Sequence, residues 1–215
     1  MKLLRPTRFR YFLRRLRESH FTVLDIGCGN HSATATKFWF PHCEYYGTDI
    51  SRSYANDEHD FGLMAKFYEK DLTKLEFSDI PDHFFDVMLM THVIEHLPNG
   101  DLVLEQLLPK LKQSGVLYLE YPGARSLRLP KMQGRGTLNF YDDTTHVRVY
   151  SLDELAPIVE RNGFRIIKKG TRRDWQRLAL MPLLVANSLL RRSDALAGDF
   201  WDLLGFAEFI YAEKI

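Results

Sequence analysis

Four residues near the start of the chain have the types and the spacing that suit the binding of a nucleoside. Asp25, Gly27 and Gly29 lie in the stretch from Val23 to Asn30, which begins as an apolar run. Two glycines spaced by one residue let the backbone turn sharply and let a ligand approach bare main chain. Asp49 follows Gly27 by 22 residues, a separation at which an acid at the tip of the next strand accepts hydrogen bonds from ribose hydroxyls. The alternative is an ordinary turn followed by an acid that caps a helix.

A second group of residues has donor atoms for proton transfer or for a metal ion. If Thr91 to Leu97 form a helix, His92, Glu95 and His96 stand at positions i, i+3 and i+4 and face one side. His146 can reach the same side from a later loop. Imidazole and carboxylate groups bind divalent metals, and such a metal orients hydroxyls and lowers their pKa. The other interpretation is that Glu95 and His96 only hydrogen-bond the loop.

For these residues to form one site, strands must place them at the same edge of a sheet. The run from Val23 to Ile26 indicates a buried strand of a parallel sheet, and Asp25 stands near its carboxyl end, where an open α/β sheet binds ligands. A helix is expected to follow at 34–40, because Pro41 stops it. Further apolar runs predict strands at 43–50, 66–72, 84–90, 116–121, 164–169 and 206–212.

Composition limits the class of protein. At 215 residues and 25.2 kDa the chain fits one domain with a single core. The net charge of +1 gives no overall field that favours nucleic acid. Cys28 and Cys43 suggest no disulfide framework, so we expect a cytoplasmic protein. Arginines interrupt the first residues too often for a signal peptide, and the longest apolar run, 178–190, is too short to span a bilayer.

Two segments leave alternatives open. Phe9, Phe12 and Leu16 recur at helical spacing, which predicts an amphipathic helix over residues 7–18 with arginines on its other face. Those arginines either form a solvated face, lie on an anionic membrane or steer a phosphorylated substrate. The stretch 172–192 has an apolar middle and basic ends, so it is a buried core helix, a lid over the substrate or an interfacial segment.

Several of these motifs together resemble one family. The pattern around Asp25 is similar to the first motif of class I, Rossmann-like, S-adenosylmethionine-dependent methyltransferases, Asp/Glu-x-Gly-x-Gly-x-Gly, although His31 stands where the family has its last glycine. Residues 85–97 are similar to the family's Phe-Asp-x-Val … x-Glu-His-Leu run. Residues 146–164 contain its His-Val-Arg-x-Tyr-Ser-x-x-Glu-Leu … Gly-Phe run. The resemblance covers about 20–170 and points to the type 11 and type 23 methyltransferase-domain group.

The resemblance implies a three-layer α/β sandwich with a mostly parallel seven-stranded sheet whose last strand is antiparallel. It implies a single domain over 1–215, made of a basic N-terminal helix at 1–19, a cofactor-binding core at 20–170, a lid or helical segment at 171–203 and the last strand at 204–215. The implied cofactor is S-adenosylmethionine. The residues implied to bind it are Asp25, Gly27, Cys28, Gly29, Asp49, Ile50, Asp71, Leu72 and Thr91.

The implied reaction is methyl transfer to a small-molecule oxygen, nitrogen or carbon, mainly by positioning. Histidine suits a general base near neutral pH, and His92, His96 and His146 lie in family segments that border the pocket. The set His92, Glu95, His96 and His146 also resembles the metal site of O-methyltransferases that act on ubiquinone precursors and on small-RNA 3′ ends. Those enzymes have Glu where this chain has His92, so a metal-free site is the leading expectation.

Other functions remain open at this stage. A nicotinamide dehydrogenase would use the same glycines and Asp49, although Ser32 falls where its third glycine is expected. A cofactor-binding module without catalysis, which recruits a partner, would keep the same binding residues. RNA is a weaker acceptor candidate, supported only by the arginine-rich start and by the loop 122–139. The sequence does not indicate an oligomeric state; it allows peripheral membrane contact.

Overall fold

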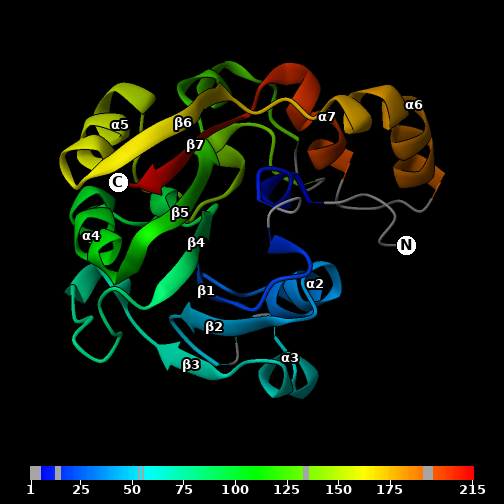
Figure 1. Ribbon diagram of the computed structural model, residues 1–215. Coiled ribbons are helices and arrows are strands. Elements are labelled where there is room, and N and C mark those ends of the chain that lie inside the picture. The colour runs from blue at the N-terminus through cyan, green and yellow to red at the C-terminus, as the bar shows by residue number, and fades with distance from the viewer. Residues whose placement is uncertain (1–5, 13–15, 53, 55, 133–135, 191–195) are drawn as a thin grey trace.

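The computed structural model describes residues 6–12, 16–52, 54, 56–132, 136–190 and 196–215. Seven strands form one sheet in the order β3-β2-β1-β4-β5-β7-β6 (Figure 1). Neighbouring strands from β3 to β5 are parallel, while β7 runs antiparallel to both β5 and β6. This confirms the predicted mostly parallel sheet with an antiparallel last strand. The strands are β1 (Phe21–Ile26), β2 (Cys43–Asp49), β3 (Lys66–Glu69), β4 (Phe85–Thr91), β5 (Leu111–Pro122), β6 (Phe164–Thr171) and β7 (Ala207–Lys214).

Helices lie on both faces of the sheet. α4 (Gly100–Leu107) and α5 (Leu152–Arg161) lie at one side in Figure 1, whereas α2 (Ser32–Trp39) lies at the other. Short α3 (Glu58–Gly62) precedes β3, and two helices, α6 (Trp175–Leu190) and α7 (Leu196–Leu204), connect β6 to β7. Ser151 begins α5, because its hydroxyl oxygen accepts a hydrogen bond from the Glu154 amide.

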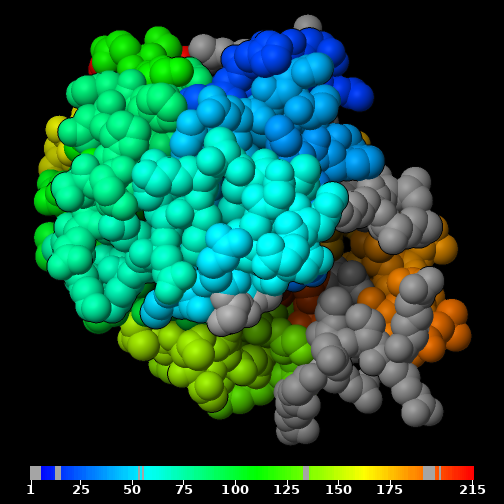
Figure 2. All heavy atoms as spheres, turned by 90° about the horizontal axis from the view of Figure 1, so that it is seen from below, coloured from blue at the N-terminus to red at the C-terminus, as the bar shows by residue number. Residues whose placement is uncertain are grey.

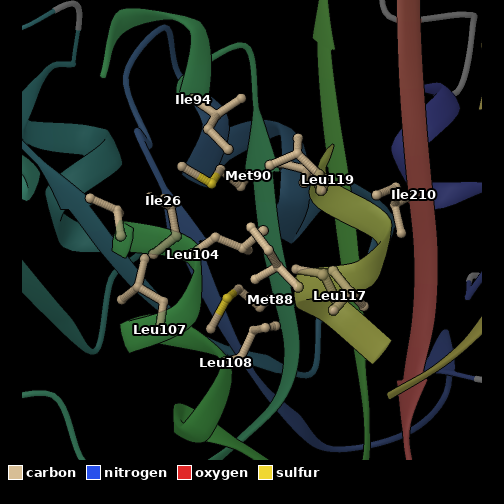
Figure 3. Packing of buried hydrophobic residues seen from close by; sticks show 14 of the residues in the cluster. Ile26, Met88, Met90, Ile94, Leu104, Leu107, Leu108, Leu117, Leu119 and Ile210 are labelled. Atoms are coloured by element: carbon tan, nitrogen blue, oxygen red, sulfur yellow. The ribbon is translucent and has the colours of Figure 1, made fainter. Parts of the chain in front are cut away.

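The core divides into two clusters because alternate residues of a strand point to opposite faces. One cluster packs β1, β4 and β5 against α4 and α5, and Figure 3 shows Met88 and Met90 of β4 facing Leu104 of α4. The second cluster lies on the opposite face, where Val87 and Leu89 of the same strand meet aromatic residues from the N-terminal segment. The two faces together bury the middle strands completely, so the ligand site must lie at an edge of the sheet.

Residues 7–12 differ from the amphipathic helix expected over residues 7–18, whereas Leu16 has helical backbone and its amide donates to the Phe12 carbonyl oxygen at 2.9 Å. Thr7–Phe9 form a single 3₁₀ turn, η1, and residues 13–15 lie outside the described part of the chain. Phe9 and Phe12 are buried as expected, but Arg8 is not on a solvated face. Its Nη2 donates to Ser32 Oγ at 3.2 Å, because the tight 3₁₀ turn directs successive side chains differently from an α-helix.

The chain after β4 is a second departure from expectation. Thr91 to Leu97 do not form an α-helix: His92 has a left-handed backbone with φ of 55°, and only Ile94–His96 form a 3₁₀ turn, η3. The backbone of His92 is held there because its amide donates to the Glu120 carbonyl oxygen at 2.9 Å. The regular i, i+3, i+4 spacing therefore does not apply to these residues.

The two helices between β6 and β7 stand beside the sheet rather than on it (Figure 1). α6 packs against α7, and much of α6 is open to solvent: Leu183 is 69% exposed and Leu190 is 86% exposed. The interpretation of 172–192 as a buried core helix is therefore wrong. Within the described residues, we find no helix with the length and apolar character needed to cross a membrane.

Candidate functional site

The glycine loop follows β1 and is joined to the end of β2. The amides of Gly27 and Cys28 donate to the Thr48 carbonyl oxygen at 2.8 and 3.1 Å, and the amide of Gly29 donates to Asp49 Oδ2 at 3.0 Å. Gly27 has φ of 69°, a conformation that favours glycine. The loop is therefore fixed against the carboxylate that ends the neighbouring strand.

Asp49 lies in a position to bind a ligand at this edge. One of its oxygens accepts from Gly29, and the other accepts from the amide of Ile50 at 2.8 Å. A carboxylate oxygen accepts more than one hydrogen bond, so both oxygens keep acceptor capacity. Burial raises the pKa of Asp49, although these two amides act in the opposite direction. Ile50 beside it is 64% exposed, which leaves an apolar surface next to the acid.

Asp25 is buried behind the loop. Its Oδ2 accepts from Ser32 Oγ at 2.6 Å and from the Tyr45 hydroxyl at 2.7 Å. Burial raises the pKa of Asp25, while the Arg8 charge and the two hydroxyl donors lower it. Through Ser32, Asp25 is connected to Arg8, so this acid orders the start of α2 and the N-terminal turn around the loop.

The remaining predicted cofactor residues end β3 and β4. Asp71 Oδ1 accepts from the amide of Thr73 at 3.1 Å and from its hydroxyl at 2.6 Å, and Leu72 is buried. Thr91 is the last residue of β4; its Oγ1 is buried and has no hydrogen-bond partner in the described part of the chain. The predicted residues thus gather at the carboxyl ends of β1 to β4. The strand order reverses at β1, which has β2 on one side and β4 on the other, and open α/β sheets bind their ligands at such a point.

A cavity of about 170 Å³ lies beside this edge. Its walls come from segments far apart in the sequence: the N-terminal turn, the ends of β4 and β5, and the helices after β6. Polar and charged side chains dominate it, so it suits a polar ligand group more than a purely apolar one. The lining residues are Pro6, Thr7, Arg8, Thr91, His92, Glu120, Arg172, Arg177 and Trp201.

His92 lies between two buried carboxylates at this cavity. Its Nδ1 is 3.2 Å from Glu95 Oε1 and its Nε2 is 3.1 Å from Glu120 Oε1. Its ring also contacts the Trp201 ring, with centroids 4.8 Å apart. Burial alone would lower the pKa of His92, but the two carboxylates outweigh it and raise the pKa to about 9. At neutral pH His92 therefore carries a proton on both nitrogens, the opposite of the state a general base needs.

Glu120 joins His92 to a second buried ion pair. Arg172 Nη1 donates to Glu120 Oε1 at 2.8 Å, and the Tyr118 hydroxyl donates to the other oxygen. Burial would raise the pKa of Glu120, yet Arg172 and His92 hold it well below its usual range. Arg172 also donates from Nε and Nη2 to the two oxygens of Asp202 on α7, at 3.1 and 3.0 Å. The ion pairs of Arg172 with Glu120 and Asp202 thereby connect the end of β5 to the helices after β6.

Glu95, His96 and His146 form a cluster in which one ligand atom from each lies within 4.8 Å of the others. Three of the four residues that we predicted for a metal site thus come together, whereas both ring nitrogens of His92 are engaged by carboxylates, Nδ1 by Glu95 of the cluster and Nε2 by Glu120. His146 Nδ1 donates to the Phe140 carbonyl oxygen at 2.7 Å, so in the neutral ring Nε2 presents its lone pair toward Glu95. Glu95 is 1% exposed, and its Oε2 has no hydrogen-bond partner among the described residues.

A second cluster, His31, Asp57 and Asp60, has a structural explanation. Asp60 accepts from His31 Nδ1, from the Thr34 hydroxyl and from the Asp57 amide, so it joins α3 to the start of α2. His31, which replaces the last glycine of the motif, has a left-handed backbone with φ of 57°. The side chain of His31 thus turns toward Asp60 and stabilises the loop from outside.

Of the residues that line the cavity, only Thr91 and His92 were predicted as site residues; those missed include Arg8, Glu120, Arg172 and Trp201. Arg8 was expected on a solvated face, and Glu120 is one polar residue within an apolar strand. The isolated acid in the run from Val116 to Tyr121 was the available signal, because a charge is rarely placed in a buried strand without a partner. Its partner Arg172 lies 52 positions away along the chain, so the pairing itself could not be inferred.

Comparisons with known proteins agree with one another. The sequence model of one protein family, described as Methyltransferase domain, matches residues 3–169. A search of curated proteins finds no match. Among solved structures, a SAM dependent methyltransferase from Archaeoglobus fulgidus is similar over 96% of this chain and 91% of that chain, with 23% identity and a TM-score of 0.58.

Two further structures are similar at low identity. An S-adenosylmethionine dependent methyltransferase from Mesorhizobium loti covers 96% of this chain and 98% of that chain, with 13% identity and a TM-score of 0.63. The YcgJ protein from Bacillus subtilis covers 94% and 96%, with 20% identity and a TM-score of 0.58. At these identities the likeness is one of fold, and the matched lengths show that the whole chain takes part in it.

Proposed function

Since the chain belongs to the methyltransferase-domain family and is therefore an S-adenosylmethionine-dependent methyltransferase, we propose that it moves a methyl group to an oxygen, nitrogen or carbon atom of a small-molecule acceptor. The observation that carries this proposal is the contact between Gly29 and Asp49 at the same carboxyl edge of the sheet from which Thr91 enters the wall of a polar cavity. A nucleoside bound along that contact would direct its reactive end toward the cavity.

The residues at the edge of the sheet fit the cofactor. Asp49 has acceptor capacity for ribose hydroxyls, and Ile50 offers an exposed apolar surface to a base. Thr91 Oγ1 is a buried polar atom without a partner among the described residues, which is costly unless a ligand completes it. Arg8 Nε is in the same condition, and we assign to Arg8 the role of pairing with the cofactor's carboxylate.

When bound, S-adenosylmethionine supplies an electrophilic methyl group on a sulfonium. The protein's contribution is then to hold the acceptor atom in line with that methyl group, and positioning of this kind supplies several kcal/mol of a barrier. His92 and Arg172 both line the cavity. The two ring nitrogens of His92 are held by Glu95 and Glu120, so it is Arg172, with N–H groups to spare, that would orient an acceptor by donating a hydrogen bond. A nicotinamide dehydrogenase, the rival enzyme class, has no support from the family that the chain matches.

A hydroxyl or amine acceptor also has to lose a proton. Of the three histidines predicted as bases, His146 has the suitable geometry, because its Nδ1 is held by the Phe140 carbonyl oxygen and its Nε2 is the acceptor nitrogen. His96 lies beside it, with ring centroids 4.8 Å apart. We therefore assign proton removal to His146 and His96, and assign to His92 the holding of Glu95 and Glu120 in place at the cavity.

Methyl-labelled cofactor tests the proposal directly. The protein is incubated with labelled S-adenosylmethionine and a cell extract that has been separated into small-molecule, protein and RNA fractions. We expect label in the small-molecule fraction, and we expect its loss with Asp49→Ala but not with the surface variant Asp79→Ala. Label confined to protein or RNA would overturn the small-molecule assignment. If the protein binds the cofactor but no fraction becomes labelled, the result would favour a non-catalytic binding module.

The cluster of Glu95, His96 and His146 supports a second candidate, a metal-assisted O-methyltransferase. Two imidazoles and one carboxylate suit Zn²⁺, Mn²⁺, Co²⁺ or Fe²⁺, and the unpartnered Glu95 Oε2 lies in the cluster. Titration with Co²⁺ tests it, because ligation by imidazole changes the visible spectrum of the ion. We expect saturable binding that is lost in Glu95→Gln and retained in Asp57→Asn, a variant of the other cluster. Methyl transfer that is unchanged by chelators would exclude this candidate.

The proposal also includes the cellular compartment in which the protein acts. Cys28 and Cys43 are both buried free thiols, and unpaired thiols suit a reducing compartment. We accordingly assign the protein to the cytoplasm, where its cofactor and small-molecule acceptors are available. Fractionation of cells that express a tagged full-length chain tests this assignment.

A further inference from the structure

The outward face of α6 is apolar from end to end. Trp175, Ala179, Leu183, Ala186 and Leu190 recur at spacings of four and three residues, so they lie on one side of the helix. All five are exposed; Trp175 is 70% exposed, and Leu183 and Leu190 are 69% and 86% exposed. A helix on the surface of a soluble domain usually presents charged and polar residues on this side. Here the outward side carries the apolar residues instead.

The other side of α6 already has a partner. Met181 and Val185 are partly buried and Ser188 is buried, where the helix packs against α7. Figure 2 shows the orange residues of α6 at the rim of the molecule, away from the cyan residues around β3. The apolar outward face is thus neither part of the core nor covered by another described element, and apolar patches of this kind mark contact surfaces.

Positive charge accompanies this face. No Asp or Glu occurs between Asp174 and Asp194, whereas Arg191 and Arg192 follow the helix directly in the sequence. Arg177 lies on the other side of the helix, where it pairs with Asp202 at 3.5 Å. The first 17 residues contain seven Lys and Arg and again no Asp or Glu. The two basic stretches meet at the start of α6, because the Thr7 hydroxyl donates to Asp174 Oδ2 at 3.1 Å.

We propose that the outward face of α6 docks on an anionic lipid bilayer. Apolar residues and a tryptophan on one helix face, with arginines at its ends, have the chemistry of a helix that lies in the interface between headgroups and acyl chains. Its 16 residues span about 24 Å at the helical rise, which is too short to cross the bilayer and suits a helix that lies along it. The basic stretches favour negatively charged headgroups, and they would repel a second copy of the same surface.

The docked helix also borders the site. Arg177 of α6 and Arg172 just before it line the cavity, so the bilayer would lie close to the cavity entrance. This arrangement suits an acceptor with an apolar part that stays in the membrane and a polar part that enters the cavity. The docking itself is measured without any acceptor, so it stands or fails separately from the proposed reaction.

Flotation with lipid vesicles tests the docking. The full-length protein is mixed with vesicles of phosphatidylcholine, or of phosphatidylcholine with phosphatidylglycerol, and separated on a density gradient. We expect flotation with the phosphatidylglycerol vesicles, weakened by added salt. The double variant Leu183→Gln/Leu190→Gln should bind at least about tenfold more weakly, since each leucine loses apolar burial. The matched control Leu102→Gln replaces a leucine that is 47% exposed on α4 and should bind like the wild type.

Tryptophan fluorescence provides an independent measurement. Trp175 is 70% exposed in the free protein, so transfer into the bilayer interface should shift the emission to shorter wavelength, and Trp175→Phe should remove the shift. Unchanged calorimetric affinity of each variant for S-adenosylhomocysteine establishes that it is folded. Absence of the wild-type protein from the vesicle fraction would overturn the proposal. A dimer that Leu183→Gln/Leu190→Gln converts to a monomer would overturn it equally, because a second copy would then cover the face.

Discussion

Arg172 Nη1 lies 2.8 Å from Glu120 Oε1, and both side chains are buried. This ion pair connects the segment before α6 to β5, which belongs to the middle of the sheet. Glu120 also pairs with His92, and Arg172 also pairs with Asp202. Removal of one partner would upset the charge balance of this buried network, a change that costs more than the loss of a surface ion pair. This contact and the bonds of Arg172 to Asp202 therefore connect the two helices after β6 to the sheet.

The first prediction concerns this pair. Arg172→Met should reduce the free energy of unfolding by about 3–5 kcal/mol, because buried Glu120 loses one of its two counter-charges and Asp202 loses the guanidinium that bonds both of its oxygens. Urea unfolding followed by circular dichroism measures the change. Arg165→Met is the control: Arg165 pairs with Glu213 at 3.0 Å, but its side chain is 67% exposed, so we expect a loss below about 1 kcal/mol. Equal losses in the two variants would contradict the role of Arg172.

The second prediction concerns cofactor affinity. Asp49→Ala should raise the Kd for S-adenosylhomocysteine by about 10- to 100-fold, because hydrogen bonds to a charged acceptor are lost. Asp49→Asn keeps one acceptor oxygen and should therefore raise the Kd by a smaller factor. Isothermal titration calorimetry gives both values, with Asp79→Ala as the control, since Asp79 forms a surface ion pair with Lys70 at 2.7 Å. An unchanged Kd in Asp49→Ala would mean that this carboxylate does not hold the ribose.

The third prediction compares two glycines with positive φ. Gly27 has φ of 69°, and a Cβ there would lie 2.3 Å from Val93 Cγ2; Gly163 has φ of 82° with no atom within 4 Å. Gly163→Ala should cost about 1–2 kcal/mol of stability, from backbone strain alone. Gly27→Ala should cost about 1–3 kcal/mol more, because β-branched Val93 cannot move aside freely. In thermal unfolding, Val93→Ala should restore part of the loss in Gly27→Ala and none in Gly163→Ala.

The fourth prediction concerns acid stability. Burial would raise the pKa of Asp60, but the Thr34 hydroxyl, His31 and the Asp57 amide donate to it and lower the pKa from 3.8 to about 2. A carboxyl group whose pKa is lower in the folded state stabilises the fold above the unfolded pKa, and loses that effect as the pH falls toward the folded value.

Asp60→Asn should therefore lower the free energy of unfolding by about 1–2 kcal/mol at pH 6, and the difference from the wild type should shrink between about pH 4 and pH 2. Denaturant titrations at a series of pH values measure it. Glu58→Gln, a change on the exposed side of the same helix, should show no such trend. A wild-type advantage that persists unchanged at pH 2 would exclude this origin.

Local patterns in the sequence predicted most of the fold and which residues gather at the carboxyl edge of the sheet. The strand, glycine loop and helix around Gly27 are encoded within a few neighbouring residues, and Asp49 follows because parallel strands bring their carboxyl ends to one edge. The pattern did not encode how His92 is oriented. A helix was expected there, yet its amide bonds to the Glu120 carbonyl oxygen on a neighbouring strand, and this tertiary contact overrides local spacing.

The polar side of the cavity was beyond sequence reasoning for a related reason. Arg8 reaches Ser32, and Arg172 reaches Glu120, across separations of 24 and 52 residues. Such pairs depend on which strands are neighbours: β7 lies between β5 and β6, and Arg172, just after β6, reaches Glu120 of β5 across the end of β7. The charge and periodicity of a sequence describe one helix or strand at a time. This cavity is formed by several helices and strands together, so these patterns do not predict which residues line it.

The position of β7 also affects how the protein is made. During synthesis β6 leaves the ribosome well before β7, but β7 alone pairs with both β5 and β6. Until the residues of β7 emerge, β6 has no strand beside it, and the first five strands present an open edge at β5. The sheet therefore cannot close in the order in which its strands are translated, and that edge is the place where a nascent chain would be open to wrong pairing or to a chaperone.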